Sequence, residues 1–521
     1  MRIIFTAFAV LAVLVVSLTC VFAQTTGDYR SNGTGGGNWS VGTTWQKYNG
    51  SSWIATGTPP TGAETTTILS TDSVYINVAV AVTGTIVNQG ILSGGSNLTI
   101  ASGGTYQHDR DAGSIPLCTW STGSTLLITG VTGTAPNNRN QSFYNMTFNT
   151  LGLLSNLSMS LDSVTIGGNV TVLNSSAARW YLTTALAGDS GIVSIMGDVI
   201  VSGGSFSSNG TGNANTKFVI NQYGNINVTG GNFSVSRGSQ GSGTGSTRWY
   251  LHNGNFSMSN AITQNSNPTN AWFVFDKAGT QTLTLGTGNT LTALPIVVMG
   301  GTTLNMGLSQ LSGSGLFTLN AGATLATATP GGLDSAIFVT GTVMMDTGAS
   351  FIFYGSAAQI TGLTMPATVN NLVINNAAGV TLSRTTTING ELRLVAGIFD
   401  NTIPFTLGPS GSISFEGGSL LHSVSVKSEA SSVPRTFFVN QNYPNPFNPS
   451  TTIRYGLPHE SFVSVRVFNV LGQEVAILID GRQDAGIHAV VFDASSLGSG
   501  VYLCRIQYGS IVETKRMMLV K

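Results

Sequence analysis

A five-residue motif recurs four times in the middle of the chain, and its spacing limits the fold more than any other feature. Each copy begins with Gly and then Asn or Asp, and carries apolar residues at its third and fifth positions. The copies span residues 168–172, 197–201, 224–228 and 254–258, so they begin 29, 27 and 30 residues apart. Repeats of this length without helical periodicity are typical of coils of short strands stacked on one another.

An aromatic-rich segment accompanies this motif in each unit. Its copies are Arg179–Leu182, Lys217–Ile220, Arg248–Leu251 and Trp272–Phe275. The two segments together predict a right-handed parallel β-helix over residues 24–424, with apolar ladders inside and Thr, Ser and Asn ladders outside. The alternative is a string of Ig-like sandwiches. These strands, however, lack hairpin turns at a spacing of about 8–12 residues.

Three tryptophans, Trp39, Trp45 and Trp53, lie near the start of the predicted β-helix. An uncapped solenoid exposes its core and its strand edges, so we expect these side chains to cover the open end. Ordinary core tryptophans would be compatible with that role. A platform for sugar rings is a third interpretation.

Residues 436–521 have the pattern of a separate β-sandwich. Val463, Val465 and Val467 alternate with polar residues, and Gly472 marks a hairpin between two such runs. About six short strands in this length predict an Ig-like sandwich. Cys504 lies in one of these strands and is expected to be a small buried hydrophobe. Residues 425–435 carry no strand pattern and are predicted to form a linker.

Several motifs follow one another in this tail. They are Tyr-Pro-Asn-Pro-Phe-Asn-Pro-Ser-Thr at 443–451, Asn-Val-Leu-Gly-Gln-Glu-Val at 469–475, Ser-Gly-Val-Tyr at 499–502 and the terminal Lys521. Over roughly residues 434–521 the tail resembles the type A C-terminal sorting domain of type IX secretion. It is also similar to the Ig-like domain of flagellar-hook capping proteins. Cys504 departs from the sorting family, which usually has an aromatic or aliphatic residue there.

The resemblance implies a Gram-negative bacterium and export across the outer membrane by the type IX machinery, which reads the tail. It further implies removal of the tail, followed by surface attachment or release. The Trp-containing opening at residues 36–45 resembles the first coil of many β-helical proteins exported by this route. The alternative for the tail is an Ig-like module without a sorting role.

The N-terminal residues 1–23 have the pattern of a secretory signal peptide. Arg2 is followed by an apolar run, and the small-x-small sequence ending at Ala23 predicts cleavage before Gln24. A lipoprotein signal ending at Cys20 is an alternative, although the residues before Cys20 fit that pattern poorly. An uncleaved membrane anchor is the other alternative.

Charge and cysteine content exclude several classes of partner and fold. The formal net charge is +0 and charged residues make up only 8% of the chain, so nothing indicates a nucleic-acid or membrane-surface partner. Of the three cysteines, Cys20 lies in the leader, and Cys118 and Cys504 belong to different predicted domains. A disulfide framework is therefore not expected.

The sequence offers little that resembles a catalytic site. The densest polar patch, His108-Asp109-Arg110-Asp111, has side chains suited to cation binding or acid–base chemistry. We favour a solvated loop whose charges satisfy one another. The histidines are dispersed, and none has zinc-ligand spacing: His108, His252, His422, His459 and His488. We therefore predict no catalytic, cofactor-binding or metal-ligating residues, and no cofactor.

Arg179, Lys217 and Arg248 each precede an aromatic residue and would line up as a basic–aromatic ridge if they occupied equivalent positions. We favour the simpler interpretation, a charge at a strand start that is kept out of the core. The chain is thus expected to be a secreted or cell-surface structural or adhesive β-helix, and not an enzyme. Its expected partners are the type IX machinery and an extracellular glycan or another cell surface. The alternatives are a polysaccharide-degrading β-helix and a matrix component without a specific ligand.

Overall fold

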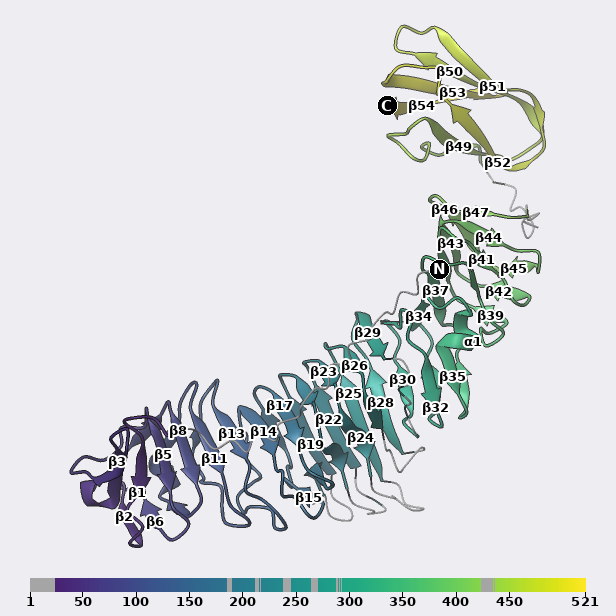
Figure 1. Ribbon diagram of the computed structural model, residues 1–521. Coiled ribbons are helices and arrows are strands. Elements are labelled where there is room, and N and C mark those ends of the chain that lie inside the picture. Colours follow the sequence, from purple (N-terminus) through teal and green to yellow (C-terminus); the bar gives the residue numbers. More distant parts are fainter. Residues whose placement is uncertain are drawn as a thin grey trace, which may run out of the picture. The chain divides into compact units, whose positions relative to one another are not determined.

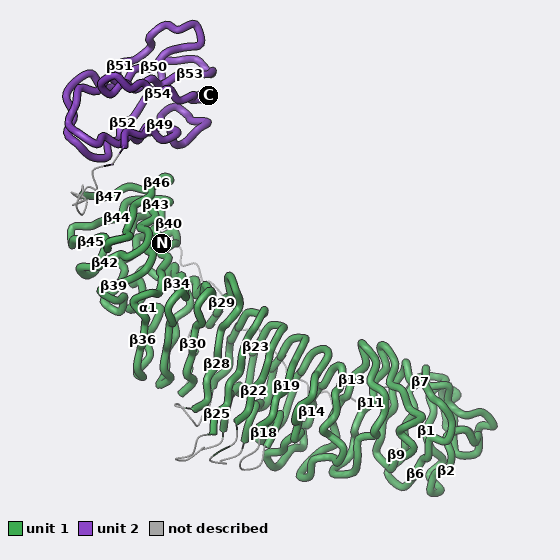
Figure 2. Tube along the Cα trace, turned by 180° about the vertical axis from the view of Figure 1, so that it is seen from behind, with its two compact units in different colours: residues 1–423 green, residues 424–521 purple. Residues whose placement is uncertain are grey.

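The computed structural model describes residues 24–422, except 185–189, 211–214, 216, 238–244, 264–269, 287, 288, 290 and 292, together with 434 and 436–521. The chain divides into two compact units, Met1–Ser423 and Val424–Lys521 (Figure 2). The predicted signal peptide lies outside the described residues, as does the predicted linker apart from Pro434.

The first unit is a parallel β-solenoid, as the repeat predicts (Figure 1). One face runs along the whole unit, and each of its strands pairs in parallel with the strand of the next coil. Its strands in stacking order are β1 (Tyr29–Ser31), β5 (Thr65–Ile68), β8 (Thr85–Asn88), β11 (Thr105–His108), β13 (Thr125–Ile128), β14 (Asn145–Asn149), β17 (Val170–Asn174), β20 (Val199–Val201), β23 (Ile226–Val228), β26 (Phe256–Met258), β29 (Gly279–Leu285), β31 (Thr302–Asn305), β34 (Thr324–Thr327), β37 (Ser350–Tyr354), β40 (Leu372–Asn375), β43 (Glu391–Ala396) and β46 (Ser412–Phe415).

Further parallel sheets form the other faces of the coils. An eight-stranded sheet contains β16 (Val164–Ile166), β19 (Ser190–Ile195), β22 (Lys217–Gln222), β25 (Ser246–Leu251), β28 (Ala271–Phe275), β30 (Ile296–Val298), β33 (Phe317–Leu319) and β36 (Val343–Met345). A five-stranded sheet contains β15 (Leu157–Ser158), β18 (Arg179–Thr183), β21 (Ser205–Asn209), β24 (Gly231–Ser236) and β27 (Ala261–Thr263).

Shorter sheets complete the two ends of the solenoid. Near the start they are β2 (Gly36–Asn38), β6 (Ser73–Tyr75) and β9 (Ile91–Ser93), and β7 (Val80–Val82), β10 (Leu98–Ile100) and β12 (Thr119–Trp120). Later they are β32 (Leu311–Gly313) and β35 (Ile337–Val339), β38 (Gln359–Ile360), β41 (Val380–Thr381), β44 (Ile398–Asp400) and β47 (Ser419–Leu420), and β39 (Thr368–Val369), β42 (Thr386–Ile388) and β45 (Phe405–Leu407). The helices are η1 (Gly42–Thr44), η2 (Gly95–Asn97) and α1 (Gly332–Ala336). None of the helices in the described ranges has the length and apolar character needed to cross a bilayer.

The repeated motif forms the apolar interior of the long face. Val170, Val199, Ile226 and Phe256 pair in register across successive coils, and each is at most 1% exposed. The fifth motif position forms a second buried column two residues further along each strand. Removing such columns from water is the main source of solenoid stability, because each coil buries its apolar face only against its neighbours.

The leading glycine of the motif is required by the close approach of successive coils. A Cβ on Gly224 would lie 2.2 Å from the carbonyl oxygen of Gly197, and one on Gly254 would lie 2.0 Å from that of Gly224. Backbone atoms of the next coil cannot move aside as a flexible side chain would. Only glycine therefore fits this column.

The Asn or Asp that follows the glycine forms a hydrogen-bonded ladder along the solenoid. Oδ1 of Asn169 accepts from the backbone N–H of Asp198 at 2.8 Å, Asp198 Oδ1 from that of Asn225 at 2.6 Å, and Asn225 Oδ1 from that of Asn255 at 2.9 Å. Each side chain thus satisfies a backbone donor at the turn of the next coil. This ladder and the glycine column together explain why the motif repeats.

The start of the solenoid is closed by an antiparallel hairpin. Strands β3 (Trp45–Tyr48) and β4 (Trp53–Ala55) pair with each other, and β3 pairs with the free edge of β1. Trp39 and Trp45 are both 1% exposed and pack edge to face with ring centroids 5.0 Å apart. Trp53 is only half-buried and lies under the guanidinium of Arg30. Trp39 and Trp45 are therefore core residues, and Trp45 belongs to the hairpin that protects the strand edge.

The pairing register of the long face shifts by two residues at β29. Leu283 of this strand pairs with Phe256 of β26, whereas Gln281, two residues earlier, pairs with Leu304 of β31. A two-residue shift keeps the same side chains facing inward. The buried Gln281 amide is satisfied, since its Nε2 donates to the carbonyls of Leu251 and Gly254 at 2.7 and 2.9 Å.

The second unit is a β-sandwich of two antiparallel sheets. One sheet contains β48 (Phe438–Val439), β49 (Ser450–Leu457) and β52 (Gly486–Asp493). The other contains β51 (Glu474–Gln483), β50 (Ser461–Asn469), β53 (Gly500–Tyr508) and β54 (Ile511–Leu519). Val463, Val465 and Val467 face the shared core, and Cys504 is fully buried there as expected. Cys118 and Cys504 are both free thiols. The Ig-like character of this sandwich stays a prediction.

Candidate binding surfaces

The structure corrects part of the interpretation favoured from the sequence for the His108 patch: Asp109, Arg110 and Asp111 do lie in a loop after β11, but His108 does not. His108 ends β11, points into the solenoid and is fully buried. Its Nε2 lies 2.7 Å from the carbonyl oxygen of Ala112, so this nitrogen carries the proton, and Nδ1 faces the Tyr106 hydroxyl at 3.4 Å. That hydroxyl accepts from Asn88 Nδ2 at 2.8 Å. Burial lowers the pKa of His108, so the ring is neutral and held within the core.

The next two residues of the patch bond to neighbouring coils and not to each other. Asp109 accepts from Gln89 Nε2 at 2.9 Å and from Thr129 Oγ1 at 2.7 Å. The Arg110 guanidinium donates to the carbonyl oxygen of Gly90. These contacts connect three successive coils, so Asp109 and Arg110 help to hold neighbouring coils together.

Asp111 fills a similar role at a turn. Its Oδ1 accepts from the backbone N–H groups of Thr132, Gly133 and Thr134 at 2.9, 2.8 and 2.9 Å. Burial alone would raise the pKa of Asp111, but these backbone hydrogen bonds outweigh it and lower the pKa to about 2. The whole patch therefore serves the solenoid scaffold.

The three basic residues that precede aromatics do not form a ridge. Arg179 lies on β18 of the five-stranded sheet, whereas Lys217 and Arg248 lie on the eight-stranded sheet. Within that sheet Arg248 pairs with Val219, two residues beyond Lys217. Arg179 begins β18 and alternates with the core residue Trp180, so it faces away from the apolar core as expected, although it is only 6% exposed; its Nη1 donates to Ser234 Oγ at 3.2 Å. Burial lowers the pKa of Arg179 to about 10.

Arg248 instead borders a hollow on the outer side of the eight-stranded sheet, which we call the Trp272 hollow. Its volume is about 350 Å³. The Arg248 guanidinium lies 3.8 Å from the centroid of the Trp272 ring, and its Nη1 donates to the carbonyl oxygen of Asn270 at 2.9 Å. The lining residues carry no carboxylate: Arg248, Tyr250, Trp272, Val274, Pro295, Val297, Met299, Leu316, Thr318, Asn320 and Met344. The aromatic side chains of this hollow can stack on a flat apolar surface of a ligand, and the Arg248 guanidinium can contact polar groups at the edge of that ligand.

A histidine–carboxylate pair lies beside the hollow. His252 Nδ1 is 3.0 Å from Asp276 Oδ2, and the His252 ring stacks on Tyr250 with centroids 5.9 Å apart. Burial raises the pKa of the Asp276 carboxyl. One acid and one base of this kind are enough to move a proton. In the part of the chain that the structure covers, no three His, Cys, Asp or Glu side chains cluster closely enough to hold a metal ion.

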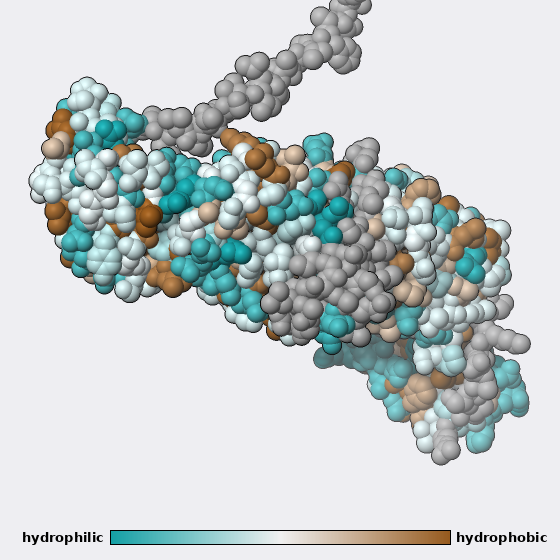
Figure 3. Space-filling view, turned by 90° about the horizontal axis from the view of Figure 1, so that it is seen from below, coloured by the Kyte–Doolittle hydropathy of each residue, from teal (hydrophilic) through white to brown (hydrophobic). Residues whose placement is uncertain are grey.

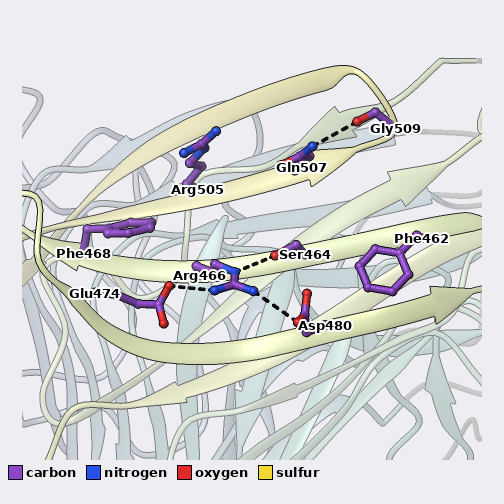
Figure 4. A pocket seen from close by; sticks show the side chains of 9 residues that line it. All are labelled: Phe462, Ser464, Arg466, Phe468, Glu474, Asp480, Arg505, Gln507 and Gly509. Atoms are coloured by element: carbon purple, nitrogen blue, oxygen red, sulfur yellow. Dashed lines mark hydrogen bonds and ion pairs between the residues drawn. The ribbon is translucent and has the colours of Figure 1, made fainter.

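A second hollow, of about 470 Å³, lies on the outer face of the four-stranded sheet of the tail. We call this surface the Arg466 face; its residues are Phe462, Ser464, Arg466, Phe468, Glu474, Asp480, Arg505, Gln507 and Gly509 (Figure 4). Arg466 lies at its centre and bonds to Glu474 at 2.8 Å, Asp480 at 3.1 Å and Ser464 at 2.8 Å. The alternation of β50 places these side chains outward because Val463, Val465 and Val467 face the core.

The proline-rich motif of the tail is used internally. Phe447 is 2% exposed, and its backbone exchanges hydrogen bonds with Met518 and Val520 of the C-terminal segment. Asn445 Oδ1 accepts from the N–H of Met518 at 2.8 Å, and the terminal Lys521 Nζ donates to the carbonyl oxygen of Ser495 at 2.6 Å. These motif residues thus fasten the ends of the sandwich together.

Comparison with known proteins bears on the tail alone. A family model described as Secretion system C-terminal sorting domain matches residues 441–521. Searches of curated proteins and of solved structures return no match for the chain. The match agrees with the motifs at 443–451 and 469–475. Residues 441–521 are a secretion system C-terminal sorting domain, which engages the type IX secretion machinery and directs this β-solenoid protein to the cell surface or the extracellular space.

Proposed function

We propose that the solenoid is a passive adhesive element that binds extracellular glycan and has no enzymatic activity. The observation that carries this proposal is the Trp272 hollow. Sugar rings present apolar faces that stack on aromatic side chains, and their hydroxyl groups hydrogen-bond to nearby polar groups. Trp272 and Tyr250 offer the first kind of contact, and Arg248 offers the second.

The rest of the solenoid surface supports passive contact. The face in Figure 3 is mostly pale and teal, and its brown apolar patches are small and separate. The charged residues of the His108 patch bond to backbone and side chains of neighbouring coils, as described above. Weak contacts repeated along many displayed copies would give a cell surface high avidity.

The test exposes the secreted protein to a panel of immobilised polysaccharides and scores both retention and new reducing or unsaturated ends. We expect retention without products. Trp272→Ala, or Met344→Lys, which places a charge at the 49% exposed rim, should weaken retention by about tenfold or more. Tyr75→Ala removes a 50% exposed aromatic from another sheet and should leave retention unchanged.

The second candidate function is polysaccharide cleavage, which the His252–Asp276 pair favours. New chain ends that disappear in Asp276→Asn would overturn the adhesive proposal in its favour. Neither retention nor products would leave a structural rod without a specific ligand as the best account.

A further inference from the structure

Two arginines stand side by side on the Arg466 face but have different surroundings. Arg466 on β50 and Arg505 on β53 are direct cross-strand partners with both side chains pointing outward. Arg466 is neutralised by Glu474 and Asp480. Arg505 is exposed, and within residues 436–521 it has no hydrogen bond or ion pair (Figure 4).

Arg505 has no direct ion pair because both carboxylates of the face bond to Arg466. The two arginines and two carboxylates balance in number, but the pairing leaves the Arg505 guanidinium with open donors. A partner molecule with a carboxylate that reaches Arg505 would pair with it.

The same face offers apolar contacts around the charge. Phe462 is 56% exposed at one end of the β50 row, and Phe468 lies at the other end, with Ser464 and Arg466 between them (Figure 4). An apolar anchor beside a desolvated charge is typical of the energetic centre of an interface. The motif residues Phe447 and Asn445 bond to the C-terminal segment of the domain and are not part of the Arg466 face.

We propose that the Arg466 face is the surface by which the sorting domain docks on the export machinery. The occupant is a segment of that machinery with a carboxylate for Arg505 and an apolar side chain for the hollow between Phe462 and Phe468. The basis for this choice of partner is charge complementarity with Arg505, which has no direct ion pair within residues 436–521. The proposal concerns export alone, so it stands or falls independently of glycan binding by the solenoid.

The experiment uses the full-length chain produced in a bacterium with an active type IX system, and measures the fractions in the periplasm and on the cell surface. Arg505→Glu should reduce surface delivery at least tenfold, and Arg505→Gln should reduce it less. Thermal unfolding of the purified chains should show Arg505→Gln to be as stable as the parent, because the change breaks no hydrogen bond or ion pair within residues 436–521. Phe462→Ser, at an exposed position, should reduce export without lowering stability.

Arg454→Glu is the matched control, since Arg454 is an exposed arginine on β49 of the other sheet. It should be delivered normally. Normal delivery of Arg505→Glu would overturn the proposal. Equal loss in Arg454→Glu would also overturn it, because the defect would then follow from net charge. A joint loss of export and stability in Arg505→Gln would assign a structural role to Arg505 and reject the docking surface.

Discussion

The close contact between glycines of neighbouring coils predicts that replacing Gly224 by alanine lowers the stability of the solenoid. A Cβ at this position would lie 2.2 and 2.3 Å from the carbonyl oxygen and carbon of Gly197 in the neighbouring coil. The coils would have to separate, but the hydrogen bonds from Asn225 N to Asp198 Oδ1 and from Val199 N to Asn225 O, at 2.6 and 2.8 Å, hold them together. Overpacking costs about 1–3 kcal/mol and a weakened hydrogen bond about 1 kcal/mol, so Gly224→Ala should lose about 2–4 kcal/mol.

The assay is urea unfolding of the secreted protein, followed by far-ultraviolet circular dichroism. A loss of this size corresponds to a fall of about 1 M or more in the urea midpoint. Gly133→Ala is the matched control, because no atom lies within 4 Å of the Cβ that it adds. Equal urea midpoints for the two variants would refute the argument that contact with the neighbouring coil requires glycine at position 224. The loss of stability would then follow from replacing any glycine.

Three other predictions can be checked with standard methods. Asn225→Ala should cost about 1 kcal/mol in urea unfolding because it leaves the N–H of Asn255 unpaired. Asn225→Asp keeps the acceptor for that N–H but should also lose stability, because it replaces the Nδ2 donor, 3.3 Å from Asp198 Oδ1, with a second carboxylate. Burial lowers the pKa of His108, so at acid pH the unfolded chain binds a proton more readily than the folded chain does. The free energy of unfolding should therefore be full above the ordinary histidine pKa of about 6.5 and should fall as the pH drops below it. This fall should be smaller in His108→Gln. Truncation before Asn442 should leave the solenoid in the periplasm, as measured by cell fractionation, and surface delivery of the truncated chain would contradict the role of the tail.

The repeat predicts the solenoid because its rule is local and strict. In each unit a glycine occurs where the coil turns, and an amide or carboxylate follows where the coil hydrogen-bonds to the next one. Two apolar residues then enter the core. Val170 and Val199 could therefore be placed inside the solenoid without knowledge of the other faces. The strands of the tail were equally visible, since Val463, Val465 and Val467 alternate with polar residues over a long run.

The grouping of Arg179–Leu182 with Lys217–Ile220 and Arg248–Leu251 was wrong because apolar alternation looks alike on every face of a solenoid. The Arg179–Leu182 segment resembles Arg248–Leu251, yet it pairs with Ser205 and Phe206, and the true counterpart on the eight-stranded sheet is Ser190–Ile195. Sequence similarity between units identifies which strands lie on the same sheet only if the turns between the strands have equal lengths. Here the units differ by several residues, so the equivalent strands lose their alignment.

His108 could have been placed correctly from a signal that its polar neighbours concealed. Tyr106 is an inward residue of β11, and a residue two positions later on a strand faces the same way. The pairing column Asn88, His108 and Ile128 then enters the core. The three charged residues that follow His108 favoured a loop. The alternation of inward and outward side chains along β11 instead required a buried histidine with hydrogen-bond partners of its own.

The Trp272 hollow illustrates why a repeat predicts architecture better than function. It extends from β25 to β36, over the same coils in which the pairing register shifts by two residues at β29 and the glycine motif is lost. Strict repetition places similar side chains on each coil and leaves a regular surface. Where the repeat is lost, Trp272, Val297 and Met299 border a depression. A search for binding sites in related solenoids should therefore begin at coils where the repeat fails, and a regular coil with an equal affinity for glycan would argue against this rule.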